Sequence, residues 1–193
     1  LVLVGSAVAA GFLIAFSLAI LAHRHRWLKT PFLAGTGILY TIPSISFFFL
    51  LLPITGRGQL TAIIALTAFN LQIIFRNMTT GLQNVPSNVT EAATGIGMTN
   101  SQVLWKVELP LAMPEIIAGL RIATVSTVAL ATLAVFANGG GLGAEIITGS
   151  NITFKTGIIV AGSIAVIMAI LFDGILLLVR KLLAPWERKR VAA

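Results

Sequence analysis

E-A-A-T-G-I-G-M-T-N-S-Q-V-L-W-K-V-E-L-P, from Glu91 to Pro110, is the longest polar-rich stretch of an otherwise apolar chain. Long apolar segments flank it, so we expect it to form a loop between membrane helices. The loop carries helix-start signals of its own. Ser87 follows Pro86 and can cap a first helix, and residues 99–102 (T-N-S-Q) predict a capping box at a second.

Gly97 and Pro110 mark the predicted ends of these two helices. Glycine tolerates the left-handed backbone that ends many helices. Proline has no N–H to donate and restricts the residue before it, so Pro110 is expected to stop the second helix. The two helices, residues 87–110, form a compact protrusion that we call the knuckle. A protrusion on the aqueous side of a membrane protein is suited to contact another protein.

The composition indicates a polytopic helical membrane protein. Of 193 residues, 57% are hydrophobic and only 10% are charged, and the mean hydropathy is +0.99. A soluble domain carries about a quarter charged residues. One span needs about 20 apolar residues, which leaves room for about five or six spans. We expect one transmembrane domain over residues 1–193, with a cytoplasmic loop at about 77–115. The sequence contains no cysteine, which excludes disulfides and thiolate metal sites.

Five spans are expected from the apolar segments, with residues 145–156 either re-entering the membrane or lying along its surface. The predicted spans are 1–22, 32–54, 60–75, 116–137 and 157–179.

The basic residues set the expected orientation, because Lys and Arg are enriched on the cytoplasmic side. With the knuckle inside, eleven of the thirteen lie inside or at the inner edge: Arg24, Arg26, Lys29, Arg76, Lys106, Arg121, Arg180, Lys181, Arg188, Lys189 and Arg190. Only Arg57 and Lys155 lie outside. The knuckle and the C-terminus are therefore expected in the cytoplasm.

Polar residues within the predicted spans are candidates for a translocation path. Pro43 predicts a kink in span 32–54, where Ser44 and Ser46 can satisfy the freed backbone groups. The kink is either a packing feature or a wall of the path. Asn70 and Gln72 must find partners on other helices or line a wet cavity. The candidate path residues are Pro43, Ser44, Ser46 and Asn70.

Asp173 is the only acidic residue well inside a predicted span. Such a charge is a functional candidate by default. A structural pairing with a basic residue near the cytoplasmic end, or a contact between helices, is the favoured interpretation. His23 and His25 are interpreted as solvated residues near the membrane surface, since a lone pair of histidines two positions apart is a weak metal site. No metal site is predicted.

The knuckle resembles the EAA signature of the permease subunits of ABC importers. Three residues separate Ala93 from Gly97, nine separate Gly97 from Val107, and one separates Val107 from Leu109. Val107 stands where that family favours isoleucine, a conservative difference. The residues that the resemblance implies for coupling to an ATPase are Glu91, Ala92, Ala93, Gly97, Val107, Leu109 and Pro110.

The resemblance implies a type I ABC importer fold and a transport subunit that is not itself an enzyme. ATP and Mg²⁺ would bind a partner ATPase dimer, and this chain would need no cofactor. A second permease subunit, identical or related, and an extracytoplasmic binding protein would complete the complex in a bacterial cytoplasmic membrane. No nucleic acid is expected as a partner. The glycine run at 139–143 is not a P-loop, because it lacks the G-K-[ST] ending.

A narrower resemblance is to the glycine betaine, carnitine and choline permeases. It rests on residues 40–44, 106–111, 119–125 and 139–143. Methionine or other amino-acid permeases are the alternative, and a stand-alone carrier or channel is a further one. A quaternary ammonium ligand calls for an aromatic cage, and the chain has few aromatic residues outside Phe47-Phe48-Phe49. We therefore assign no substrate ligands from the sequence.

Overall fold

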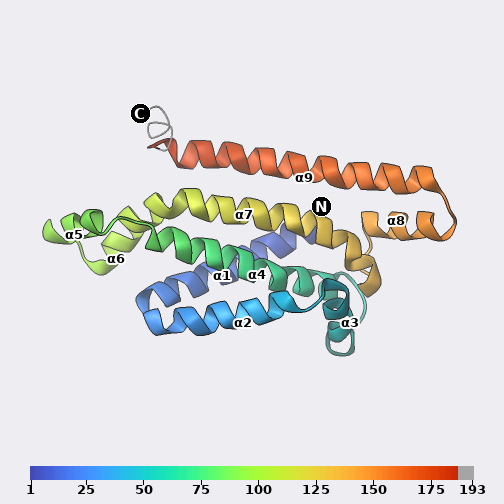
Figure 1. Ribbon diagram of the computed structural model, residues 1–193, viewed down its shortest axis with the longest axis horizontal. Coiled ribbons are helices and arrows are strands. Elements are labelled where there is room, and N and C mark those ends of the chain that lie inside the picture. Colours follow the sequence, from blue (N-terminus) through green and yellow to red (C-terminus); the bar gives the residue numbers. More distant parts are fainter. Residues whose placement is uncertain (187–193) are drawn as a thin grey trace.

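The computed structural model describes residues 1–186 as an elongated bundle of helices (Figure 1). No strand occurs within this part of the chain, so the predicted all-α fold is confirmed. In chain order the elements are α1 (Val2–Arg24), η1 (Arg26–Leu28), α2 (Lys29–Thr41), α3 (Ser44–Thr55), α4 (Gln59–Gln83), α5 (Ser87–Gly95), α6 (Asn100–Val103), η2 (Leu104–Glu108), α7 (Leu109–Ala131), η3 (Thr132–Ala137), α8 (Leu142–Asn151) and α9 (Lys155–Leu183).

Four helical runs are long and apolar enough to cross a membrane: α1, α4, the run Asn100–Ala137 and α9. Helices α2 and α3 pass the same length and hydropathy test together, and they make a fifth crossing when the bent pair is counted as one broken span. Helix α2 leads back along the bundle from the end of α1 (Figure 1). The prediction of about five spans is therefore confirmed. Helices α4 and α9 are longer than the predicted spans, because each continues through polar residues beyond its apolar segment.

The predicted span 32–54 is two helices, not one kinked helix. Pro43 separates α2 from α3, whose axes differ by 99°. Proline cannot donate to the helix ladder, and it pushes Ile42 into an extended conformation with ψ 127°. The predicted rescue of the kink by Ser44 and Ser46 is wrong. Neither hydroxyl forms a hydrogen bond within residues 1–186, because a full break turns the freed groups into ordinary helix ends.

Helix α4 is the centre of the bundle and contacts α1, α2, α3 and α7. Small buried residues let α1 lie close to it: Ala7, Gly11, Ala15, Ala19 and Ala22. At Gly11 an added Cβ would stand 2.8 Å from the Cβ of Asn70. Two apolar clusters fill the bundle, one around Phe75 and Met78 and the other around Phe48 and Phe69.

The knuckle forms at one end of the bundle, as α5 and α6 (Figure 1). The capping box is confirmed, because Thr99 N–H donates to Gln102 Oε1 at 2.9 Å and Gln102 N–H donates to Thr99 Oγ1 at 3.4 Å. Gly97 has φ +90°, and its N–H donates to Thr94 O at 2.9 Å. The predicted cap at Ser87 is wrong: Pro86 occupies the cap position and Ser87 is the first helical residue.

Pro110 does not end a helix as predicted. The segment η2 is a π-helical turn in which Leu109 N–H bonds to Leu104 O, five residues back. This turn resets the hydrogen-bond register, so Pro110 takes a helix-start position at the beginning of α7. Pro114, whose position suggested the first turn of a span from Ile116, lies buried inside α7.

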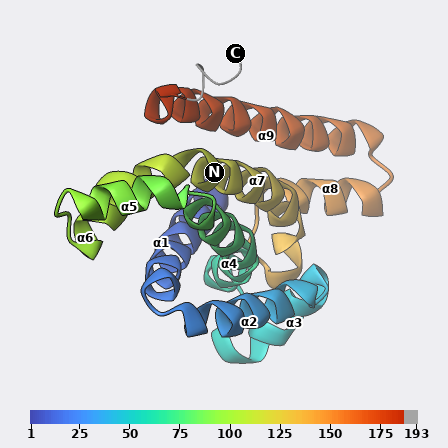
Figure 2. The same cartoon turned by 60° about the vertical axis from the view of Figure 1, so that its left-hand side comes forward.

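The glycine run makes the reversal at the opposite end of the bundle. Asn138, Gly140 and Gly141 have φ values of +62°, +72° and +86°. The chain then forms α8, which packs against α9 (Figure 1). In both views α9 lies on the α7 side of the bundle, away from α2 and α3 (Figures 1 and 2).

The basic residues follow the predicted division between the two ends. The turn after α1, the knuckle and the last turn of α9 share one end, whereas Arg57 and Lys155 adjoin turns at the other (Figure 1). Arg121 is an exception, because it lies within α7 and not at its inner edge. Arg188, Lys189 and Arg190 lie outside the described residues.

Candidate functional site

The knuckle presents an exposed surface with apolar side chains on it. Glu91 and Ala92 of α5 are exposed. Ile96 is 78% exposed and Trp105 is 52% exposed. Large apolar side chains on a water-facing protrusion are typical of a protein contact. The outer surface of the knuckle is thus suited to bind another protein.

The underside of the knuckle is anchored in the bundle. Ala93, Leu104 and Leu109 are buried. Leu104 and Leu109 belong to the same apolar cluster as Phe75 and Met78 of α4. Since close-packed side chains transmit displacement, a force on α5 would reach α4 and α7. Val107 and Pro110 are half-buried at the junction.

Two polar hollows lie beside the knuckle, with volumes of about 510 Å³ and about 620 Å³. His23 of α1 and Glu108 of η2 line both of them. The two side chains meet between the hollows, with His23 Nε2 at 2.8 Å from Glu108 Oε2. This contact ties the cytoplasmic end of α1 to the base of the knuckle.

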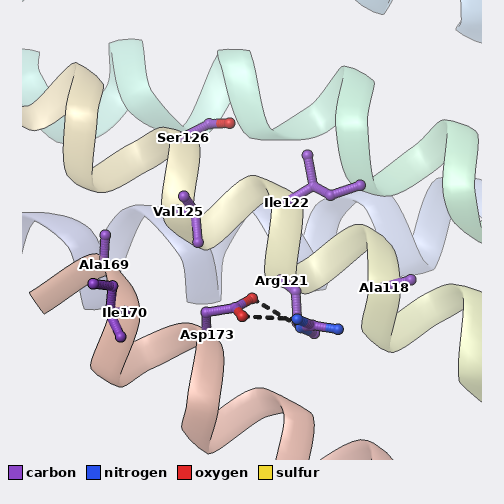
Figure 3. Close-up of a pocket in the computed structure, with 8 residues that line it drawn as sticks. All are labelled: Ala118, Arg121, Ile122, Val125, Ser126, Ala169, Ile170 and Asp173. Carbon is purple, nitrogen blue, oxygen red and sulfur yellow. Dashed lines mark hydrogen bonds and ion pairs between the residues drawn. The ribbon is translucent and has the colours of Figure 1, made fainter. Parts of the chain in front are cut away.

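An ion pair joins α7 to α9 within the spans (Figure 3). Arg121 Nε donates to Asp173 Oδ1 at 2.8 Å, and Arg121 Nη2 donates to Asp173 Oδ2 at 2.7 Å. The predicted pairing of Asp173 with a basic residue is confirmed, but the partner lies in the middle of α7 and not near the cytoplasmic end as predicted. The pair borders a groove of about 570 Å³ whose other lining residues are Ala118, Ile122, Val125, Ser126, Ala169 and Ile170 (Figure 3). A bidentate pair neutralises both charges where the bilayer would penalise either alone.

The amides predicted inside the third span do find partners on other helices. Thr127 Oγ1 donates to Asn70 Oδ1 at 2.8 Å, which joins α7 to α4. Thr36 Oγ1 donates to Gln72 Oε1 at 2.5 Å, which joins α2 to α4. The Nδ2 of Asn70 is buried without a hydrogen-bond partner among the described residues. These bonds cross-link α4 to its neighbours.

The candidate path residues do not gather in one place. Pro43, Ser44 and Ser46 lie at the break between α2 and α3, whereas Asn70 is 1% exposed in the middle of α4. No group of three or more metal-ligating side chains occurs within residues 1–186.

A sequence profile of the family described as binding-protein-dependent transport system inner membrane component matches residues 7–189. This chain belongs to that family. The permease is 36% identical over 186 residues to the choline transport system permease protein OpuBB of Bacillus subtilis (strain 168), with 96% of this chain and 85% of that protein covered. It is 37% identical over 192 residues to the osmoprotectant import permease protein OsmW of Salmonella typhimurium, with 95% of this chain and 87% of that protein covered.

A solved structure supports the fold of the permease. An inward-facing MetNI methionine ABC transporter matches it with a TM-score of 0.82 at 22% identity, over 94% of this chain and 91% of that one. At this identity the likeness establishes the fold alone. The family match and these relatives show that the permease is the multi-pass membrane subunit of an ABC importer, which works with an ATPase and a substrate-binding protein.

Sequence reasoning missed the partner of Asp173 and the contact between His23 and Glu108. It predicts a basic partner for Asp173 but places Arg121 at the inner edge of the membrane. A signal existed, because one basic residue falls inside predicted span 116–137 and one acid inside 157–179. The contact of His23 with Glu108 has no such signal in the sequence. The two residues are separated by 84 others, and only the tertiary fold brings them together.

Proposed function

We propose that the permease imports an osmoprotectant of the glycine betaine, choline or carnitine class. The proposal is supported by the printed functions of its relatives, which include a glycine betaine/carnitine/choline permease of Bacillus subtilis at 36% identity over 92% of this chain. Similarity along almost the whole length supports a shared substrate class.

The knuckle is proposed as the element that couples the permease to ATP hydrolysis. Glu91 and Ala92 would contact a groove of the ATPase subunit, and Gly97 would fix the turn between the two helices. Ala93, Val107, Leu109 and Pro110 would act from beneath, by holding the knuckle on the bundle. The exposure of Glu91, Ala92 and Ile96 on a protruding helix pair is the single observation that carries this assignment, since it leaves this surface free for a partner.

The proposed mechanism is alternating access. Two permease subunits would enclose a path at their interface, and a binding protein would deliver the substrate from outside. ATP and Mg²⁺ would bind two ATPase subunits, whose closure would move the knuckle and its attached helices as a rigid body. Selectivity would reside mostly in the binding protein, so no substrate ligand is assigned to this chain.

Substrate class is tested by uptake into cells that carry the complete system. Uptake of labelled glycine betaine is measured with choline, carnitine or methionine as competitor, with and without the ATPase gene. We expect uptake that requires the ATPase and is blocked by choline or carnitine. Inhibition by methionine alone would contradict the substrate class and favour the amino-acid alternative.

A further inference from the structure

Helix α1 packs on α4 over most of its length, and its last turn meets the knuckle through apolar packing and one polar contact. His23 lies in the last turn of α1. Its Nε2 is 2.8 Å from Glu108 Oε2, and the two side chains are 30% and 14% exposed. A ring contact lies nearby, where Phe16 of α1 stands 6.0 Å from Trp105 of η2, between centroids. Both contacts fall on the π-helical turn that joins α6 to α7.

The surroundings of the pair are open and polar. The hollow on one side is lined by Arg26 and Lys29, and the hollow on the other by Arg24 and Glu91. Within residues 1–186 none of these three basic residues forms an ion pair with Glu108. The apolar cluster that contains Ala22 and Leu104 borders these hollows, and the pair forms a polar contact between α1 and the knuckle at the edge of that cluster.

Glu108 lies where the knuckle joins α7, so its contact with His23 links α1 to both. Glu108 is the last residue of η2, directly before α7 begins. Glu108 lies in the helical run that continues from the knuckle into α7, so its carboxylate moves with the base of the knuckle. An imidazole N–H donates to a carboxylate in either protonation state, and the bond is stronger when the ring is charged.

We propose that the pair His23–Glu108 is a positioning contact that makes α1 move with the knuckle during ATP-driven transport. The inference rests on the proposed coupling role of the knuckle. Without the pair, the knuckle would still bind the ATPase and move α7, but the C-terminal end of α1 would be displaced less than the knuckle. ATP would then be hydrolysed with less substrate moved per cycle.

The test compares uptake with ATP hydrolysis in the complete complex, reconstituted in liposomes with its ATPase and binding protein and supplied with labelled glycine betaine. His23→Leu and Glu108→Leu, which remove the donor and the acceptor, are expected to lower uptake per ATP hydrolysed by about fivefold, the factor that corresponds to losing one ordinary hydrogen bond. His23→Gln keeps an N–H donor and is expected to transport like the unaltered complex. The exchanged pair His23→Glu with Glu108→His is expected to regain coupling.

Two matched controls accompany these variants. His25→Leu alters an exposed histidine two positions away, and Glu145→Leu alters an exposed acid at the other end of the bundle. Both are expected to leave uptake per ATP hydrolysed unchanged. Normal coupling in His23→Leu and Glu108→Leu would overturn the inference. So would a parallel loss of uptake and hydrolysis that the exchanged pair fails to restore, because that result indicates a merely structural contact.

Motion is tested separately with spin labels, which the cysteine-free sequence makes straightforward. Labels at Arg24→Cys and Ser101→Cys, both exposed positions, report the separation of α1 from the knuckle. We expect the same separation with and without ATP in the otherwise unaltered complex, and a shift on ATP binding after His23→Leu. A shift in the otherwise unaltered complex would contradict the inference. Failure of all ATPase-dependent uptake, by contrast, would count against the proposed function itself.

Discussion

Glu91 is an exposed acid on the first helix of the knuckle, and its charge is available to a partner. We expect Glu91→Lys to reduce co-purification of the ATPase subunit by about tenfold, because a reversed charge at a contact repels its former partner. Glu145→Lys is the matched control, since it makes the same change at an exposed site on α8. Equal recovery of the ATPase with both variants would contradict a docking role for Glu91.

Arg121 and Asp173 are expected to matter through each other. Removing one leaves an uncompensated charge inside the spans, whereas removing both leaves none. Arg121→Leu and Asp173→Leu should each reduce the amount of folded permease in the membrane, and the double variant should recover most of it. Quantitative blotting and uptake per molecule measure this. A double variant that is abundant but transports nothing would instead assign the pair a part in transport.

At the scale of elements, the turn between α5 and α6 depends on one glycine. Gly97 has φ +90°, and an added Cβ there would meet nothing within 4 Å. Gly97→Ala therefore acts through backbone strain alone, of about 1–2 kcal/mol. We expect weaker ATPase binding at unchanged membrane abundance. Gly95→Ala lies two residues away in equally open space without a positive φ and should have no such effect. A Gly97→Ala variant that binds the ATPase normally would refute the need for this turn.

The packing of α4 on α7 depends on two other glycines. At Gly81 an added Cβ would lie 2.9 Å from Glu115 Cβ and 3.2 Å from Ala112 O, and at Gly119 it would collide with Asn77. We expect Gly81→Ala and Gly119→Ala to destabilise the folded permease by about 1–3 kcal/mol. Thermal unfolding of the purified permease measures this, with Gly162→Ala as the control, because a Cβ there meets nothing within 4 Å. Unchanged midpoints would contradict the close approach of the helices.

The prolines show how far the sequence predicts these elements. The rule that proline interrupts a helix correctly locates the break at Pro43. It does not predict the 99° angle between the two helices, because that angle depends on how α3 packs on α4. At Pro110 the same rule fails, since a π-helical turn upstream takes up the missing hydrogen bond. The capping box at Thr99 and the turn at Gly97 are predicted correctly, because each is decided by residues within a few positions. Long-range pairs such as His23 with Glu108 depend on the tertiary fold.

For the whole molecule, the arrangement separates two working ends. The knuckle, the basic turn after α1 and the end of α9 share one end, and the α8 hairpin and α3 occupy the other (Figures 1 and 2). Helices α4 and α7 run between them and are cross-linked by Asn70 and Thr127. A displacement at the knuckle is therefore carried toward the opposite end by packed helices, as rigid-body transport requires.

The most direct test of the account is photocrosslinking from the knuckle in membranes that contain the complete importer. A photoreactive amino acid replaces Ala92, which is exposed on α5, and in a second experiment Thr148, which is exposed on α8. The account predicts a covalent product between the permease and the ATPase subunit from position 92 alone, with a yield that changes when ATP is added. Absence of that product in a complex that transports normally, or an equal product from position 148, would contradict the central claim that the knuckle couples the permease to its ATPase.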